Sequence, residues 1–270
     1  MSVTSSVEEL IEGTKDQDNR AVFKDLWDIL SAVKDKIGQR FLLQKDPCCE
    51  DLENFTGVLE GSIGRVQAYT CDEMDWLIHS FIGTPGQGFT NMHLTAWLAP
   101  LVRVPHFGMA LGTIPDLFVY LDYIPRVDVM ADLDYLDRYV EPLNETFLAY
   151  EKDEAFSPFV SQNVTMRSAL TAASLCYVAK PSGLNIKKIE KTAMEMVERW
   201  LLFYDLAERV PVSMQMALAE RDLMVRRAIV ERDPANVMGE KIFGEKMTKR
   251  LVGTLWGEGR KSKRAGGIIQ

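Results

Sequence analysis

The spacing of apolar side chains changes twice along the chain. Over residues 20–40 apolar positions recur every three or four residues, with Leu26, Leu30 and Val33 on one stripe, which predicts a helix. Further along, the period shortens to two, and after Asp132 it returns to the helical value. The pattern therefore predicts a helix, then a group of strands, then a helical half.

The strand-like region contains five short alternating runs separated by Gly, Pro and Asp turn signals. These runs occupy residues 61–70, 74–83, 89–99, 105–112 and 116–124. The connections between them are too short for crossover helices, so an antiparallel meander is expected.

The second half contains five runs with helical spacing. They cover residues 132–152, 161–177, 186–208, 212–233 and 237–257. Helices from both ends of the chain can cover both faces of one sheet, which indicates an α+β fold, an α/β/α sandwich with a central antiparallel sheet. We expect one domain over residues 1–257 and a basic, flexible tail over 258–270.

Composition narrows the function classes. The net charge is -8 and the isoelectric point is about 5.1, which argues against nucleic acid as a partner. No apolar run approaches the ~20 residues of a membrane span, so we expect no membrane partner. The first twenty residues lack the features of a signal or transit peptide, and a cytoplasmic protein is expected.

Several kinds of cofactor site are not indicated by the sequence. The four cysteines, Cys48, Cys49, Cys71 and Cys176, have neither zinc-site nor disulfide spacing and are interpreted as reduced thiols. Glycine-rich nucleotide motifs are missing, so no tightly bound cofactor is expected.

One face of the run at 89–98 is unusually polar for a strand. Because side chains alternate, Asn91, His93 and Thr95 share a face with Trp97, while Met92 and Leu94 lie on the other. A mixed polar and aromatic face is typical of a pocket wall. His93 at its centre is a candidate acid, base or orienting group, or a histidine satisfied by a neighbour.

The next strand has little side-chain volume on the corresponding face. His106, Gly108, Ala110 and Gly112 lie in a row, and the space above them suits either a ligand or a closely packed helix.

Acidic residues gather where the last predicted strand ends. Asp122 and Arg126 flank this end and suggest either an ion pair that fixes the turn or a site. The acidic residues over 128–137 suit a turn and a helix start, where negative charge complements the helix dipole. They lack the glycine and terminal glutamate of a calcium loop, so no metal site is predicted.

The run at 212–233 has an arginine in its apolar stripe. Arg221 shares the stripe with Val225 and Ile229 and would require a carboxylate or an anionic ligand if buried. Asp222 and Arg226 are expected to form a solvated surface pair. Asp233 precedes a proline, and by pattern alone is a cap or turn residue.

Three segments resemble red chlorophyll catabolite reductases, which belong with the ferredoxin-dependent bilin reductases. They are "VYLDYIPRVDVMADLDYLDRY", "SPFVSQNVTMRSALTAAS", and "ERDLMVRRAIVERD" followed by "KIFGEKMTKRLVGTLWG". The similarity extends over about residues 55–256, with the segments in the same order and at similar gaps.

The resemblance implies an α/β/α sandwich with a pocket between the sheet and the C-terminal helices. There an open-chain tetrapyrrole would receive electrons from external ferredoxin and protons from acidic side chains. It also implies a homodimer. Of the family's two substrate-associated acids, Asp233 matches the later one, whereas the strand glutamate falls on Ala110. Another group, such as His93, His106 or Asp122, would then take that role.

The first hypothesis is therefore a reductase of a linear tetrapyrrole or related conjugated pigment. Asp233, His93 and Asp122 are the catalytic candidates, and Arg167 or Arg221 would hold a substrate carboxylate. The remaining substrate-binding candidates are Asn91, His106, Ala110 and Arg126.

Two alternatives remain open. The second hypothesis is a cofactor-independent lyase or isomerase acting on an aromatic or polycyclic molecule, favoured by the missing acid at Ala110. The third is a pigment-binding protein without catalysis.

Overall fold

A single sheet forms the centre of the protein. The computed structural model describes residues 17–260, and in that part of the chain the strand order is β1-β2-β3-β4-β5-β6-β8-β7 with every neighbouring pair antiparallel. The strands are β1 (Gln44–Lys45), β2 (Ile63–Thr70), β3 (Met74–Thr84), β4 (Phe89–Leu98), β5 (His106–Thr113), β6 (Leu117–Ile124), β7 (Phe156–Pro158) and β8 (Leu175–Ala179).

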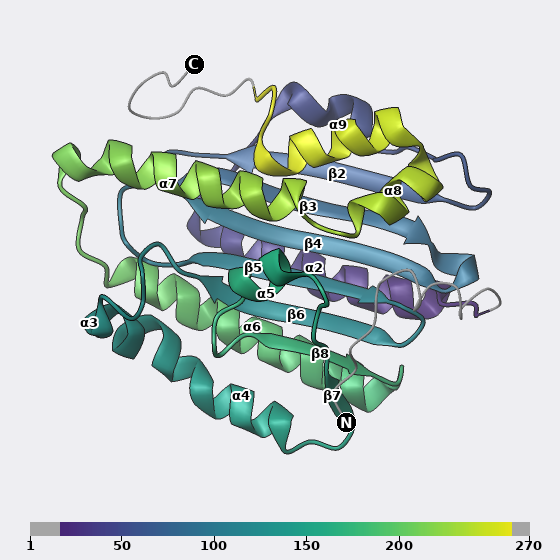
Figure 1. Cartoon of the computed structure of the whole chain (residues 1–270), viewed down its shortest axis with the longest axis horizontal. Coiled ribbons are helices and arrows are strands. Elements are labelled where there is room, and N and C mark those ends of the chain that lie inside the picture. Colours follow the sequence, from purple (N-terminus) through teal and green to yellow (C-terminus); the bar gives the residue numbers. More distant parts are fainter. Residues whose placement is uncertain (1–16, 261–270) are drawn as a thin grey trace.

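Helices precede the sheet and follow it in the chain (Figure 1). The helices are α2 (Arg20–Arg40), α3 (Leu133–Tyr135), α4 (Asn144–Glu151), α5 (Val164–Ala169), α6 (Gly183–Asp205), α7 (Val212–Glu231), α8 (Asn236–Phe243) and α9 (Glu245–Trp256). Shorter turns are the 3₁₀ helices η1 (Pro47–Leu52), η2 (Pro85–Gln87) and η4 (Glu141–Leu143), and the π-helical η3 (Leu136–Val140).

The main core lies between the sheet and the layer formed by α2 and α6, which contact each other. Leu26 and Leu30 of α2 and Trp200 of α6 are fully buried there, as the helical spacing requires. The Trp200 indole N–H donates to the Pro105 carbonyl oxygen at 2.8 Å, so this large side chain buries no unpaired polar atom.

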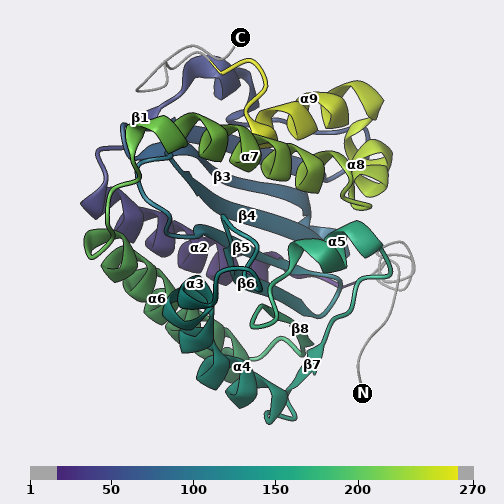
Figure 2. The ribbon, with the colours of Figure 1, turned by 60° about the vertical axis from the view of Figure 1, so that its left-hand side comes forward.

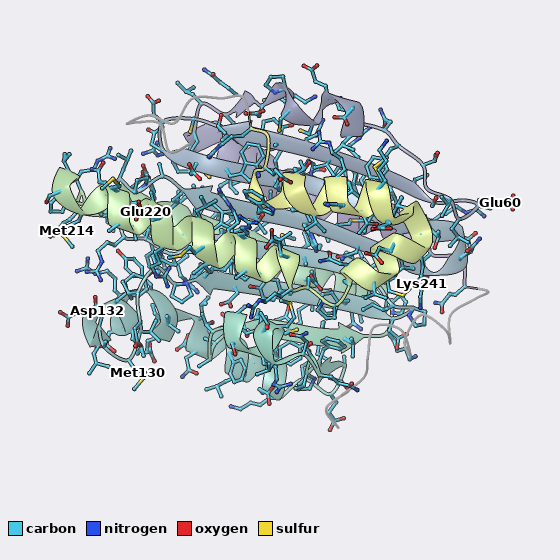
Figure 3. The ribbon with its side chains drawn as sticks, turned by 45° about the horizontal axis from the view of Figure 1, so that its top comes forward. Glu60, Met130, Asp132, Met214, Glu220 and Lys241 are labelled. Carbon is cyan, nitrogen blue, oxygen red and sulfur yellow. The ribbon has the colours of Figure 1, made fainter. Side chains whose placement is uncertain are left out.

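The opposite face of the sheet is covered by α7, α8 and α9, with α5 beside them (Figure 2). At one end of this layer, Ile78 and Trp76 of β3 pack with Phe243 and Leu251 in a second apolar cluster. Met214, near the start of α7, and Lys241, in α8, are labelled toward opposite ends of the layer in Figure 3. This arrangement confirms the predicted α/β/α sandwich.

The five predicted strands are confirmed, and each lies within two residues of its expected bounds. The helix expected over 161–177 is wrong in its second half, because 175–179 is strand β8, paired with β6. The expected helix at 132–152 is broken into short turns around Pro142, which has no N–H to donate. The expected helix at 237–257 is split at Gly244, whose φ of +81° favours glycine.

Both chain ends extend past the described residues. The expected tail falls largely on 261–270, outside the described residues, as do 1–16 of the first twenty residues. The first residues of that tail are described and held in place, since the Arg260 guanidinium donates to Asp75 Oδ1 at 2.8 Å. Within 17–260, no helix combines the length and the apolar character needed to cross a bilayer.

Candidate active site

A cavity of about 290 Å³ lies between the sheet and the layer that contains α5 and α7–α9. Its floor comes from β4, β5, β6 and β8, and its roof from the end of α7 and from α8 and α9. The lining is mainly apolar, as is typical of a small-molecule pocket. Side chains with polar groups that line it are Ser80, Thr90, Asn91, His93, Thr95, Trp97, Tyr120, Ser161, Cys176, Asp233, Asn236 and Thr248.

The β4 face predicted to be a pocket wall lines this cavity. Asn91, His93, Thr95 and Trp97 all border it, while the intervening Met92 belongs to the core on the other side of the sheet. Strand alternation alone produces this division.

Asp233 reaches the cavity from the opposite layer, in the turn between α7 and α8. One carboxylate oxygen accepts a hydrogen bond of 2.8 Å from the Ala235 N–H, so Asp233 does act as a turn residue, as expected. It also faces the cavity. The two interpretations of Asp233, turn residue and site residue, are therefore compatible.

His93 and Asp233 influence each other electrostatically. Burial lowers the pKa of His93, and the nearby Asp233 carboxylate partly offsets this effect. Burial raises the pKa of Asp233. The hydrogen bond from the Ala235 N–H and the charge of His93 lower it, but by less. Because the charge of each group shifts the pKa of the other, the two groups do not titrate independently. Such a pair in an apolar cavity can perform general acid or base chemistry.

Ala110 lines the cavity in the middle of β5. The glycines on either side do not open extra space for a ligand. A Cβ at Gly112 would lie 2.2 Å from the Thr90 carbonyl oxygen, and one at Gly108 would lie 3.2 Å from the Tyr120 hydroxyl oxygen. These glycines therefore permit close approach of the neighbouring strands, and only Ala110 matches the ligand interpretation of this row.

Asp122 is fully buried and does not line the cavity, although alternation along β6 puts it on the same face of the sheet as Tyr120, which does. Its carboxylate accepts hydrogen bonds from the Thr171 N–H at 2.9 Å, the Thr171 hydroxyl at 2.5 Å and the Tyr123 N–H at 2.8 Å. Burial raises its pKa to about 6, although these donors act in the opposite direction.

The ion pair expected between Asp122 and Arg126 is wrong, because Arg126 binds Asp222 instead. Arg126 is 1% exposed, and its Nη2 and Nε lie 2.5 and 3.0 Å from Asp222 Oδ2. Its Nη1 donates to the carbonyl oxygens of Ala99 and Val102. Arg126 therefore fastens α7 to the loops at the end of the sheet and lies outside the cavity lining.

His106 belongs to the same buried cluster and does not line the cavity. Its Nδ1 accepts from the Leu98 N–H at 2.9 Å, which places the ring proton on Nε2. That atom lies 3.2 Å from Asp222 Oδ1, at an angle too oblique for a good hydrogen bond. Burial lowers the pKa of His106 to about 4, although the negative charge of Asp222 raises it. The ring is therefore neutral at neutral pH.

Of the predictions for α7, the apolar contacts of Val225 and Ile229 with the sheet side are confirmed, whereas the buried Arg221 and the solvated Asp222–Arg226 pair are wrong. Arg221 is part-exposed, and its Nη1 lies 3.4 Å from Asp222 Oδ1, whereas Asp222 and Arg226 are the buried residues of the helix. Arg226 Nη1 lies 3.0 Å from Asp75 Oδ2. Two ion pairs with buried arginines therefore attach α7 to the sheet side, beside the apolar contacts of Val225 and Ile229 and in place of the expected solvated pair.

Arg167 also lies outside the cavity lining. Its exposed side chain donates to the carbonyl oxygens of Ser161 and Gln162 and so closes the turn before α5. No lysine or arginine occurs among the described residues that line the cavity. Within the described part of the chain, no three His, Cys, Asp or Glu side chains are grouped as a metal ion would require.

Two lining residues with transferable protons received no role from the sequence. Tyr120 shares a face of its strand with Asp122, because side chains alternate along a strand. Cys176 was missed because its segment was interpreted as helix, although its short apolar run also fits a buried strand.

Comparison with known proteins identifies the fold and the family. The chain has the fold of a solved structure of phytochromobilin synthase from tomato, determined in complex with biliverdin. The TM-score is 0.73 with 16% identity, over 86% of this chain and 82% of that one. At this identity the likeness shows the fold alone. None of the curated proteins compared with the chain matches it.

Residues 21–256 match the family described as Red chlorophyll catabolite reductase (RCC reductase). The protein therefore belongs to the red chlorophyll catabolite reductase family, and the resemblance noted in its sequence is confirmed.

Proposed function

We propose that the protein reduces an open-chain tetrapyrrole or related conjugated pigment bound in the cavity between the sheet and α7–α9. Electrons come from an external one-electron donor, and at least one of the protons comes from the pair His93 and Asp233. Family membership supports the reaction class. The observation that carries the proposal is the pairing of His93 with Asp233 across a cavity whose lining is otherwise mainly apolar.

The chemistry of the pair suits this role. Reduction of one double bond consumes two electrons and two protons, and each added electron makes the pigment a stronger base. Because burial raises the pKa of Asp233, its carboxyl keeps a proton at a pH where an exposed aspartate would be ionised. His93 borders the same cavity and interacts electrostatically with Asp233, and its role in the proposal is to help restore this proton once the pigment is protonated.

The cavity also constrains how the pigment is oriented. Because no cationic side chain lines it among the described residues, a buried substrate carboxylate would have no counter-charge. The conjugated rings therefore occupy the cavity, and any carboxylates point outward. Arg167 is the better candidate to meet them, since its neighbour Met166 lines the cavity. Arg221 precedes Asp233 by twelve residues, a helical distance of about 18 Å.

The experiment is a turnover assay with biliverdin and with red chlorophyll catabolite, without oxygen, with and without chemically reduced ferredoxin. We expect loss of the pigment's long-wavelength absorption only when the reduced donor is present. Glu220→Gln, an exposed change on α7, is the matched control for Asp233→Asn and should retain full turnover. Absence of turnover for both pigments with reduced donor would contradict the proposal.

A cofactor-independent lyase or isomerase is the second candidate. The observation that favours it is Ala110, which provides no acid at the place of the family's strand glutamate. In that case His93 and Asp233 would move protons without electron transfer, and conversion would proceed with no reductant. Binding without any conversion would instead indicate a pigment carrier.

Two partner assignments belong to the proposal. Ferredoxin is the proposed electron donor, and a homodimer is the proposed assembly, both by resemblance to the family. Light scattering of the purified chain tests the second, and replacement of ferredoxin by another one-electron donor tests the first.

A further inference from the structure

Four residues with side chains in the cavity form one row across the sheet. His93 on β4 pairs with Ala110 on β5, Ala110 pairs with Tyr120 on β6, and Tyr120 pairs with Cys176 on β8. Neighbouring strands lie about 4.8 Å apart. Two groups with transferable protons, His93 and Tyr120, therefore flank the small Ala110, whose methyl group leaves both accessible to a bound molecule.

The Tyr120 hydroxyl is directed along the sheet toward Asp122. It lies over Gly108, 3.2 Å from the place where a Cβ would stand, and Gly108 is the register partner of Asp122. The phenol and the Asp122 carboxyl lie close enough for each to perturb the other's pKa. Tyr120 thus connects the cavity with a carboxyl that does not reach the cavity itself.

The carboxyl of Asp122 is fully buried, and no ion pair joins it to a cation within residues 17–260. The groups that face it are the Tyr120 phenol, the Thr171 hydroxyl and N–H, the Tyr123 N–H and the Cys176 thiol. Arg126, the nearest arginine in sequence, is bound to Asp222. With its pKa raised to about 6 by burial, Asp122 can carry a proton close to neutral pH, whereas an exposed aspartate cannot.

We propose that Tyr120 is a further catalytic residue, which passes a proton from Asp122 to the pigment on the side of Ala110 opposite His93. This assignment rests on the proposed reductase function and deepens it. Ala110 has no transferable proton, and Tyr120 and Asp122 together would provide an acid beside it.

The step balances as follows. The external one-electron donor is oxidised twice and gives two electrons to the pigment. One proton comes from the His93–Asp233 pair. The second leaves the Tyr120 oxygen and forms a bond to a pigment atom, while the Asp122 carboxyl reprotonates that oxygen in the same step. The products are the reduced pigment, the Asp122 carboxylate and a His93–Asp233 pair that has lost one proton. Asp122 and the pair each regain a proton from solvent before the next turnover.

The test is Tyr120→Phe, which keeps the ring and removes only the hydroxyl. We expect a loss of kcat of at least about tenfold with unchanged affinity for biliverdin in absorbance titrations. Asp122→Asn should give a similar loss. Tyr69→Phe is the matched control, because Tyr69 on β2 lies outside the cavity lining. Circular dichroism and thermal midpoints check that each variant folds.

A pH profile separates a relay from a packing role. In the wild type the Asp122 proton is present below about pH 6 and is lost above it, so kcat should fall as pH rises, and Tyr120→Phe should remove this limb. Wild-type kcat and an unchanged pH profile in Tyr120→Phe would overturn the relay. A loss confined to pigment affinity would also overturn it. If the wild type fails to reduce either pigment, the proposed function itself fails.

Discussion

His93 on the sheet and Asp233 in the turn after α7 border one cavity from opposite layers, and each shifts the other's pKa. Strands β5 to β8 and helices α3 to α7 lie between the two residues in the chain. Their juxtaposition depends on how α7 is fixed to the sheet, and both the chemistry and the anchoring can be tested.

Removing either member of the pair should slow the reaction. Asp233→Asn and His93→Gln should each reduce kcat by about a hundredfold or more, the usual contribution of a general acid. Because the two residues interact electrostatically and are proposed to serve the same protonation step, the double variant should lose little beyond the worse single variant. Steady-state kinetics of the four proteins measure this coupling. Fully multiplicative losses would show that the two groups act independently.

The titration of His93 can be observed directly, because the chain has three histidines. Burial lowers the pKa of both His79 and His106 to about 4, so neither should titrate between pH 5 and 8. Asp233→Asn removes the charge that supports the protonated form of His93 and should lower its pKa further. Imidazole ¹⁵N shifts by NMR provide the measurement. An unchanged His93 pKa in this variant would place the groups too far apart to interact.

The anchoring of α7 predicts a large loss of stability. Asp222→Asn leaves the fully buried Arg126 without its carboxylate and should lower the free energy of unfolding by about 3–5 kcal/mol. The control is Glu231→Gln, which breaks the exposed pair with Arg227 on the same helix and should cost under about 0.5 kcal/mol. Urea denaturation measures both. Equal, small effects would mean that the buried pair does not hold the helix.

The same cluster predicts sensitivity to acid. Burial alone would raise the pKa of Asp222, but His106 and Arg126 outweigh it and lower the value to about 2. A lowered folded-state pKa gives stability that is present above the unfolded value of 3.8 and is lost as pH falls toward 2. Denaturation curves between pH 5 and 2 should therefore fall more steeply for the wild type than for Asp222→Asn.

Filling the cavity should weaken pigment binding without unfolding the protein. Ala110→Leu adds apolar volume at the centre of the floor and should reduce affinity for biliverdin at least about tenfold, since overlap with the ligand costs well over 1.4 kcal/mol. The matched control is Ala228→Leu on the exposed side of α7. Absorbance titration compares them, and equal affinities would place the pigment elsewhere.

Much of the fold followed from local patterns. Alternation identified the five strands and the polar β4 face, because a half-polar strand must direct its two faces into different surroundings. Strand β8 could not be predicted, because a run of five apolar residues after a helical pattern is compatible with either a helix or a strand. The orientation of α7 could not be predicted from its own sequence. Its buried Asp222 is paired with Arg126, a partner 96 positions away in the chain.

The candidate site was also predictable only in part, because some of its contacts join residues that are far apart in the chain. His93 and Asp233 were both identified, one from the strand pattern and one from the family resemblance. The expected Asp122–Arg126 pair failed because neighbours in sequence were assumed to be neighbours in space. Alternation puts Tyr120 on one face of its strand but does not predict what the side chain contacts. Its position over Gly108 depends on the register of β5 and β6.

The most direct test of the reductase assignment is a single-turnover experiment without oxygen. Wild-type protein carrying bound biliverdin or red chlorophyll catabolite is mixed with reduced ferredoxin, and the spectrum is followed together with the electrons consumed. The proposed function predicts two electrons consumed for each double bond reduced. It also predicts that Asp233→Asn stalls before product forms, while Glu220→Gln behaves as the wild type does. Conversion that needs no electrons, or normal product formation by Asp233→Asn, would contradict it.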